Sequence, residues 1–252
     1  MGILQKDAIS ADAFSASNEK AFWNYITREN TAFSDLGISV ALKPHDALSR
    51  TFECYPLPSN ASIRDWHQAL KLRSRPSILR EIDALSDRKY EALGAYVLQA
   101  IGADKVSVTP PGSEGGVDFY ASIGHSGSNL LIGSSTSPIR IVGQSKKYSV
   151  PLEASKLKEF LKTLDEVHHM SEPKTVAHIP TWFKAARGPI LGMIFAHSGF
   201  QSGADSRAMK HGVITADSVL LAQVIAESCQ LIGSSANFNS TRFHARLDSL
   251  LS

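Results

Sequence analysis

Cysteine is scarce in this chain of 252 residues, and neither sign of charge dominates it. Cys54 and Cys229 are the only cysteines and form no CxxC pair, which argues against a disulfide framework or a cysteine zinc site. A reducing cytoplasm is therefore the expected compartment. The 26 basic and 24 acidic residues leave a formal net charge of +2. This balance neither requires nor excludes nucleic acid, because a basic stripe can lie within a neutral total.

Long apolar runs and internal repeats are also missing from the sequence. No stretch approaches the length of a membrane span, and the start "MGILQKDAISADAF" lacks the apolar stretch of a signal peptide, so we expect no membrane partner. Hydrophobic residues make up 43% and charged residues 20%, as in ordinary globular proteins. The chain can therefore bury a substantial core.

The sequence pattern divides the chain into three regions. Residues 1–80 contain two helical patterns, "NEKAFWNYITREN" and "ASIRDWHQALKLRS", with two short strand candidates between them, "GISVALKP" and "RTFECYPLP". We expect a mainly helical N-terminal region there. Helices and strands alternate over residues 81–230, which predicts an α/β domain with a mixed β-sheet flanked by helices. Residues 231–252 predict a polar tail with a short helix.

Several elements of the central region have clear patterns. The helix "DRKYEALGAYVLQAIGA" has Asp87 as its expected N-cap and Gly102 as its terminator. The segments "DKVSVTPPG", "GGVDFYASIG" and "IRIVGQSKKY" are expected strands, with a hairpin excursion between the last two. An amphipathic helix in "SVPLEASKLKEFLKTLDEVHHM" precedes a buried strand in "PILGMIFAHSG". A further helix is expected to begin at Ser202.

Polar side chains at the end of "IRIVGQSKKY" form the candidate site. Alternate side chains of a strand share a face, so Gln144 and Lys146 project together, about 7 Å apart along the strand. Asp118 begins the preceding strand behind glycines that permit tight backbone geometry close to a ligand. A carboxylate, an amide oxygen and a lysine on adjacent strands predict a site for a hard divalent cation. Alternatively, Lys146 and Lys147 are solvated lysines at a strand end, and Asp118 is an ordinary turn aspartate.

The order of Glu91, "EGGVD" and "QSKKY" resembles the Mrr-like restriction endonuclease family, within the PD-(D/E)xK nuclease superfamily. The segments "HSGFQSGA" and "HGVITADSVLLAQVI" resemble that family's later strand–helix–strand–helix segment, so that the resemblance covers residues 81–230. The superfamily's acidic residue before the lysine is Gln144 here, as is common in Mrr-like members. Glu114 stands where the family often has an acid ahead of its glycines. The resemblance implies a restriction-endonuclease-like fold.

The same resemblance implies the roles of the site residues and Mg²⁺ as the cofactor, with Mn²⁺ able to substitute. Asp118 would be the principal metal ligand, with the amide oxygen of Gln144 and the main-chain carbonyl of Ser145 as further ligands. Lys146 would orient or deprotonate the attacking water and offset phosphate charge. Glu91 would bind the metal directly or through water. Alternatively, Glu91 is simply an acid favoured by the helix dipole in a first turn.

Further basic residues are candidates for DNA binding. Lys147 and Lys156 are expected to flank the duplex, and Arg73 and Arg75 belong to a basic stretch of the N-terminal region that is compatible with phosphate contacts. In the resembled family an additional domain often binds DNA. The alternatives are a solvated helix face for Lys156 and a helical cap over the catalytic domain for residues 1–80.

The expected function is that of a metal-dependent endonuclease of restriction type, acting on double-stranded DNA in bacterial defence against foreign DNA. Because one site cleaves one strand at a time, cutting both strands favours a homodimer. A partner protein of the defence system is a further expected partner. The alternatives are a repair or recombination nuclease of junction-resolvase type, and a catalytically inactive DNA-binding module of the same fold. A third alternative is a subunit that needs a partner protein for recruitment or activation.

Overall fold

The chain divides into two compact units, Met1–Leu70 and Lys71–Ser252. The computed structural model describes residues 13, 16–19, 22–24, 26–27, 42–44, 52–54, 63–112, 116–124, 137–171, 177–228, 230–232 and 238–252. The helix α2, Ile63–Ala84, spans the division, so the boundary expected after residue 80 falls inside a helix. Within the described ranges, no helix is long and apolar enough to cross a membrane.

The described part of the first unit contains one small sheet. Strand β1, Leu42–Pro44, pairs antiparallel with β2, Phe52–Cys54, which confirms the two expected short strands. Residues 16–19 and 22–24 are helical. Much of the helix expected from "NEKAFWNYITREN" lies outside the described residues, as does most of the hairpin excursion that was expected before β5.

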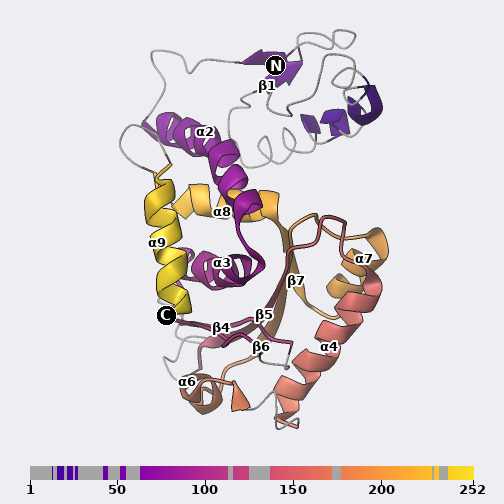
Figure 1. Cartoon of the computed structure of the whole chain (residues 1–252), viewed down its shortest axis with the longest axis vertical. Coiled ribbons are helices and arrows are strands. Elements are labelled where there is room, and N and C mark those ends of the chain that lie inside the picture. The colour runs from indigo at the N-terminus through magenta and orange to yellow at the C-terminus, as the bar shows by residue number, and fades with distance from the viewer. Residues whose placement is uncertain are drawn as a thin grey trace. The chain divides into compact units, whose positions relative to one another are not determined.

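A mixed sheet of five strands forms the centre of the second unit (Figure 1). Its strands, in spatial order, are β3 (Lys105–Val108), β4 (Phe119–Ile123), β5 (Ile139–Lys146), β6 (Ile190–Ala196) and β7 (Ile214–Asp217). Strand β4 pairs antiparallel with both β3 and β5, whereas β5, β6 and β7 are parallel. The expected mixed sheet of a restriction-endonuclease-like α/β fold is confirmed.

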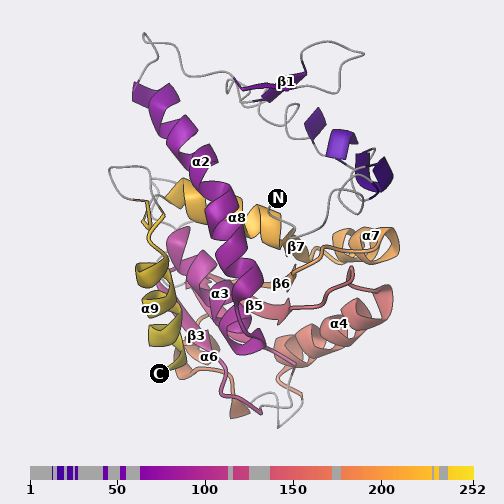
Figure 2. The ribbon, with the colours of Figure 1, turned by 45° about the horizontal axis from the view of Figure 1, so that its top comes forward.

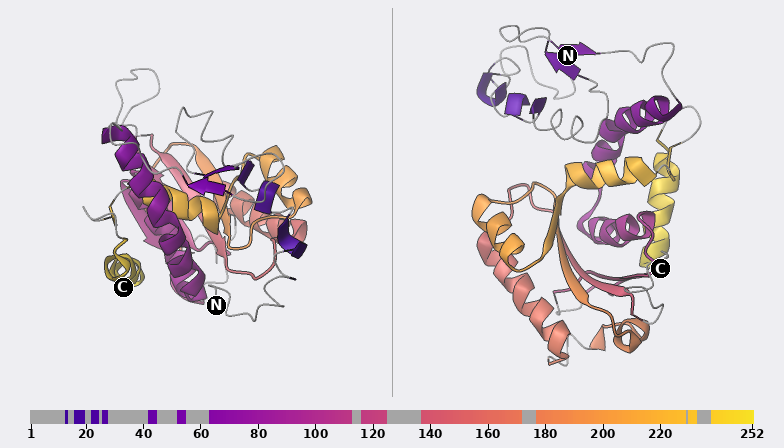
Figure 3. Two further views of the ribbon diagram at one scale, coloured as in Figure 1. Left: turned by 90° about the horizontal axis from the view of Figure 1, so that it is seen from above. Right: turned by 180° about the vertical axis from the view of Figure 1, so that it is seen from behind.

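Helices cover both faces of this sheet (Figure 2). One face packs against α3 (Asp87–Ala100), α8 (Ser218–Ser228) and α9 (Ser240–Leu251), the last being the expected C-terminal helix. The other packs against α4 (Ala154–His169), α6 (Thr181–Ala185) and α7 (Ser202–Lys210), and Figure 3 shows the sheet between the two layers. Successive strand residues join opposite cores, as period-two alternation requires: Ile141 faces α3, and Val142 faces α4.

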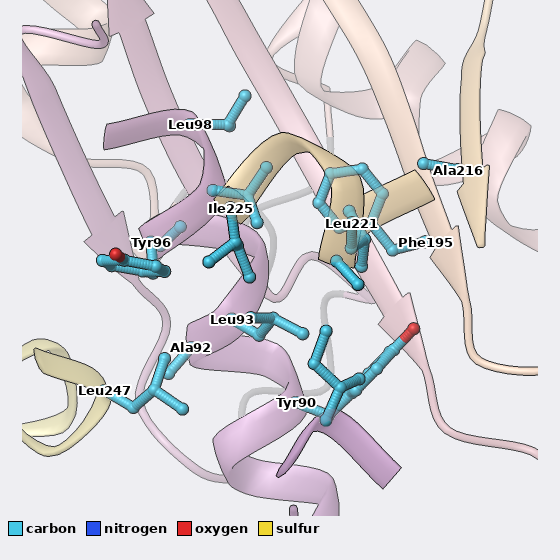
Figure 4. Packing of buried hydrophobic residues seen from close by; sticks show 14 of the residues in the cluster. Tyr90, Ala92, Leu93, Tyr96, Leu98, Phe195, Ala216, Leu221, Ile225 and Leu247 are labelled. Atoms are coloured by element: carbon cyan, nitrogen blue, oxygen red, sulfur yellow. The ribbon is translucent and has the colours of Figure 1, made fainter. Parts of the chain in front are cut away.

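Helix α3 is buried on nearly all sides, because it lies between the sheet and other helices. Every residue from Ala92 to Leu98 is buried, as is Tyr90. Figure 4 shows side chains of α3 meeting Phe195 of β6, Leu221 of α8 and Leu247 of α9 in one cluster. A helix that is apolar around its whole circumference is stable only in such an interior position.

The boundaries of α3 and α7 agree with the sequence pattern except at one N-cap. Ser86, not Asp87, is the N-cap of α3, because its hydroxyl oxygen accepts a hydrogen bond from a main-chain N–H three residues later. Asp87 instead occupies the first turn, where the helix dipole favours an acid. Helix α7 begins at Ser202, as expected, and Gln201 is its N-cap residue. Gly102, with a φ of 103°, follows the C-cap residue Ile101 and confirms the expected terminator of α3.

Helix α2 also runs further than its pattern predicts. The pattern ends at Ser74, and a proline normally disrupts a helix interior, yet α2 continues through Pro76 to Ala84. Ile78 and Ile82 are fully buried and join the core that contains α3. Tertiary burial of these side chains offsets the local preference of the chain.

Candidate active site

The start of β4 and the carboxyl end of β5 lie side by side, because the two strands are antiparallel. Asp118 directly precedes β4. Its main-chain N–H donates to the carbonyl of Gly143 at 2.9 Å, and its own carbonyl accepts from the N–H of Thr109 at 2.9 Å. Hydrogen bonds to the strands on both sides therefore fix the main chain of Asp118.

The aromatic ring next to Asp118 is held between two glycines. A Cβ atom added to Gly143 of β5 would lie 1.9 Å from the ring of Phe119, and one added to Gly94 of α3 would lie 2.2 Å from it. No other residue type fits at either position without displacing the ring. Helix α3 can approach the sheet closely at this point, and Phe119 is completely buried there.

The carboxyl group of Asp118 is largely withdrawn from water but is held by a specific contact. Its Oδ2 atom accepts a hydrogen bond from the main-chain N–H of Ser145 at 2.7 Å. Burial raises the pKa of Asp118 to about 6, against the lowering effect of that bond and of the nearby Lys146 and Arg88 cations; the Glu91 carboxylate raises it further. Among the described residues nothing donates to Oδ1, so this atom is free to bind a cation.

Gln144 presents an oriented amide beside this carboxyl group. Its side chain is only 6% exposed, and its Nε2 donates to the main-chain carbonyl of Gly116 at 2.6 Å. With Nε2 committed to a carbonyl, Oε1 becomes the end of the amide that can serve as a ligand. The neighbouring Ser145 hydroxyl is buried, and no partner for it occurs in the described part of the chain.

Lys146 ends β5 and is only partly buried. Its ammonium group lies close enough to Asp118 to lower the pKa of that carboxyl. It makes no hydrogen bond or ion pair with any residue that the structure describes, so its donors are available to a ligand. The structure thus brings the acid and the lysine together around one edge of the sheet, as the sequence predicted.

Glu91 of α3 lies close enough to Asp118 to raise the pKa of that carboxyl group, but it is already paired with Arg88. Arg88, one helical turn earlier on α3, donates to Glu91 Oε2 at 2.6 Å and, through its other terminal nitrogen, to the carbonyl of Thr109 at 2.7 Å. Arg88 was missed by the sequence analysis. Its signal was the i,i+3 spacing to an acid on a predicted helix, which is a common surface pattern.

The oxygen donors at this site are of the kind that binds Mg²⁺ or Mn²⁺, but few of them are carboxylates. Within the described segments there is no group of three or more His, Cys, Asp or Glu side chains able to hold a metal. A cation would depend on Asp118 Oδ1 and Gln144 Oε1, with the Ser145 carbonyl, Glu91 and water completing its ligands. Mg²⁺ prefers oxygen ligands and usually keeps several waters when few carboxylates are present, so this donor set fits it.

The residues expected to bind DNA are dispersed. Lys147 hydrogen-bonds to the end of α2, and Lys156 on α4 pairs with Glu159 at 3.0 Å. Arg73 and Arg75 lie on α2, and the side chain of Arg73 is outside the described residues. Their contacts with DNA stay predictions. Glu114 also lies outside the described residues.

Comparison with known proteins assigns the chain to a family. Residues 82–225 match the restriction endonuclease family Mrr_cat. The solved structure of the MspJI restriction endonuclease in complex with a 27-mer oligonucleotide is 16% identical, with a TM-score of 0.41, covering 79% of this chain and 40% of that one. The DNA modification-dependent restriction endonuclease AspBHI is 15% identical, with a TM-score of 0.43, covering 88% of this chain and 47% of that one.

This chain thus spans less than half the length of either solved protein. No curated relative matches it. The family match covers more than half of the chain and includes Glu91, Asp118, Gln144 and Lys146. The chain belongs to the Mrr_cat restriction endonuclease family.

Proposed function

We propose that this protein is a metal-dependent DNA endonuclease of restriction type, which hydrolyses phosphodiester bonds of double-stranded DNA. The observation that carries the proposal is the arrangement of Asp118 and Lys146: a partly buried carboxyl group and an available ammonium group lie together where β4 begins and β5 ends. Membership of a restriction endonuclease family supports the same function. The biological role that follows is bacterial defence against foreign DNA in the cytoplasm.

The residues at this edge supply what phosphodiester hydrolysis needs. A divalent cation bound by Asp118, Gln144, the Ser145 carbonyl and Glu91 would acidify a water molecule and neutralise phosphate charge. Burial makes the carboxylate of Asp118 poorly hydrated, which favours its exchange of a proton for a cation. The Ser145 N–H holds one carboxylate oxygen and so orients the other.

Lys146 has the second chemical role. With no partner among the described residues, its ammonium group is free to hold the attacking water by a hydrogen bond and to offset charge on the phosphate. Arg88 donates both to Glu91 and to the carbonyl of Thr109, which directly follows β3, and so fixes the orientation of the Glu91 carboxylate. Glu91 thus enters the site in a defined orientation, whether it binds the cation directly or through water.

The test is cleavage of supercoiled plasmid by the purified chain with Mg²⁺ or Mn²⁺. Lys146→Ala is expected to slow nicking and linearisation by about 10²–10⁴-fold, while thermal unfolding and duplex binding stay as in wild type. Lys210→Ala is the matched control, because Lys210 is an exposed lysine at the end of α7, without a partner in the described part of the chain. Methylated and unmethylated plasmid, compared in the same assay, would report on target choice.

Three outcomes would contradict the proposal. Wild type that binds duplex DNA but cuts it with neither cation would identify an inactive DNA-binding module. Preferential cutting of four-way junctions over linear duplex would identify a recombination nuclease. Cleavage that appears only after addition of host extract would identify a subunit dependent on a partner protein. Double-strand cutting with a rate second order in protein would support the proposed homodimer.

A further inference from the structure

Lys147, the residue after the proposed catalytic lysine, makes two hydrogen bonds inside the protein. Its ammonium group donates to the main-chain carbonyl of Asp83 at 2.8 Å and to that of Leu85. The Asp83 carbonyl lies in the last turn of α2 and Leu85 directly follows the helix. The final C=O groups of a helix lack intrahelical partners, and the helix dipole favours a cation there. The last turn of α2 carries no basic residue of its own, so a lysine 64 positions away from Asp83 supplies the charge.

His197, which directly follows β6, contacts both the end of β5 and the end of α2. Its main-chain N–H donates to the carbonyl of Lys146 at 2.9 Å, and its Nε2 lies 2.9 Å from Asp83 Oδ1. Asp83 thus binds Lys147 through its main chain and His197 through its side chain. The ring of Tyr90, which is buried in α3, meets the ring of His197 edge-on, with centroids 5.9 Å apart.

The end of α2 is a firm anchor for these contacts. Ile82 and Leu85, which flank Asp83, are 0% and 3% exposed and belong to the core that contains α3. Glu81 pairs with His244 of α9 at 2.9 Å, and this pairing lowers the pKa of Glu81. A side chain that is hydrogen-bonded to this turn is therefore anchored to the hydrophobic core of the second unit.

We propose that Lys147, Asp83 and His197 act as positioning residues that hold the end of β5 so that Lys146 stays beside Asp118. This inference rests on the proposed function, because it takes Lys146 as the lysine of the nuclease site. The β5–β6 ladder ends at Lys146, which pairs with Ala196. Beyond that pair the described contacts that hold the strand end are those of Lys147 and His197, together with the hydrogen bond from the Ser198 hydroxyl to the Tyr148 carbonyl.

The proposal reassigns Lys147 from DNA binding to the support of its neighbour. An ammonium group has three donors, and two of those of Lys147 are used on main-chain carbonyls. Moving the group to a phosphate would leave those carbonyls unsatisfied. Lys147 therefore acts through Lys146 and has no direct contact with the substrate.

The experiment compares Lys147→Met, which keeps the aliphatic stem, with Lys147→Arg, which keeps the donors. Lys210→Met is the control for loss of an exposed lysine. Three quantities are measured on the full chain: kcat and KM for duplex cleavage with Mg²⁺, the melting temperature, and hydrogen exchange of the main-chain amides at 144–149. Lys147→Met is expected to lower kcat by up to about 100-fold with KM little changed, because a small displacement of a catalytic group is enough for such a loss.

The same variant is expected to speed exchange at 144–149, and Lys147→Arg to restore most of kcat. His197→Gln is expected to act in the same direction. The Lys147→Met/His197→Gln double variant should lose little more than either single one, because both contacts hold the same strand end. A melting temperature that falls without a change in kcat would mean that the contacts are only structural and would overturn the proposal.

Two further results would overturn the positioning role. A raised KM with unchanged kcat would show that Lys147 contacts DNA, and losses that multiply in the double variant would show that Lys147 and His197 act separately. Hydrogen exchange separates this inference from the nuclease proposal. If wild type cuts no DNA, faster exchange at 144–149 in the Lys147→Met variant would still show that Lys147 anchors the end of β5. Unchanged exchange would show that it does not.

Discussion

Replacing Asp118 with Asn is expected to stabilise the metal-free protein at neutral and alkaline pH, although it removes the proposed metal ligand. Burial raises the pKa of this carboxyl group from 3.8 to about 6, even though the Ser145 N–H and the Lys146 ammonium favour its ionised form. Asn has nearly the same shape as Asp, and its side-chain oxygen can still accept the bond from Ser145. The variant therefore removes a partly buried, poorly hydrated charge with little change in packing.

The size and sign of the effect follow from the two protonation equilibria. A pKa rise from 3.8 to about 6 corresponds to about 3 kcal/mol against the ionised form in the folded state. Below pH 3.8 the carboxyl group is protonated in both states, and the relative stability it gives is fully present. As pH rises through about 6, the unfolded state releases its proton first and this stability is lost. The advantage of Asp118→Asn should grow from below about 1 kcal/mol at pH 4 to about 3 kcal/mol at pH 8.

Urea unfolding at pH 4, 6 and 8 measures this difference directly. Asp248→Asn is the control, because Asp248 is an exposed carboxylate paired with Lys89, and its loss should change the free energy of unfolding by less than about 0.5 kcal/mol. Saturating Mg²⁺ should stabilise wild type and leave Asp118→Asn unchanged, because a ligand stabilises the state that binds it. The reasoning is refuted if Asp118→Asn is less stable than wild type at pH 8, or if its gain is the same at all three pH values.

Two further predictions concern packing and DNA binding. Gly143→Ala should lower the free energy of unfolding by about 1–3 kcal/mol, because its methyl group meets the Phe119 ring; Gly203→Ala, where a Cβ meets no atom within 4 Å, is the control, and equal urea midpoints would refute the clash. Lys156→Ala should weaken duplex binding and reduce the slope of log K against log salt by about 1, with kcat unchanged. Fluorescence anisotropy across a salt series measures that slope, and an unaltered slope would place Lys156 outside the DNA interface.

The sheet and most helices were predictable because their signals are local. Period-two alternation indicated β4, an apolar run indicated β5, and helical spacing indicated α3 and α4. The extension of α2 beyond Pro76 was not predictable from local pattern, because it depends on burial of Ile78 and Ile82 in a core built from distant segments. The cap of α3 was misplaced by one residue, since Ser86 and Asp87 are both good capping residues and only the backbone decides between them.

The candidate site shows the same limit at the level of single side chains. Asp118, Gln144 and Lys146 were found because strand alternation and strand order place them at one edge. Their environment was not, because the partners that create it come from elsewhere in the chain: His197 meets Asp83 across 114 positions. A lysine in a sequence shows its donors but not its acceptors, which is why the bonds of Lys147 to the end of α2 were missed.

The raised pKa of Asp118 and the anchoring of its surroundings depend on each other. An ionised carboxyl group with a pKa of about 6 would be more stable if it turned toward water, where its pKa would return toward 3.8. It is prevented by the main-chain bonds to Gly143 and Thr109 and by the ring of Phe119, fixed between two glycines. If the main chain around Asp118 could move, its carboxylate would become hydrated and its pKa would fall. The desolvation cost that a bound cation would offset would then be lost. Rigidity at this site would therefore favour the proposed metal binding, and the proposed anchoring of β5 by the end of α2 would contribute to it.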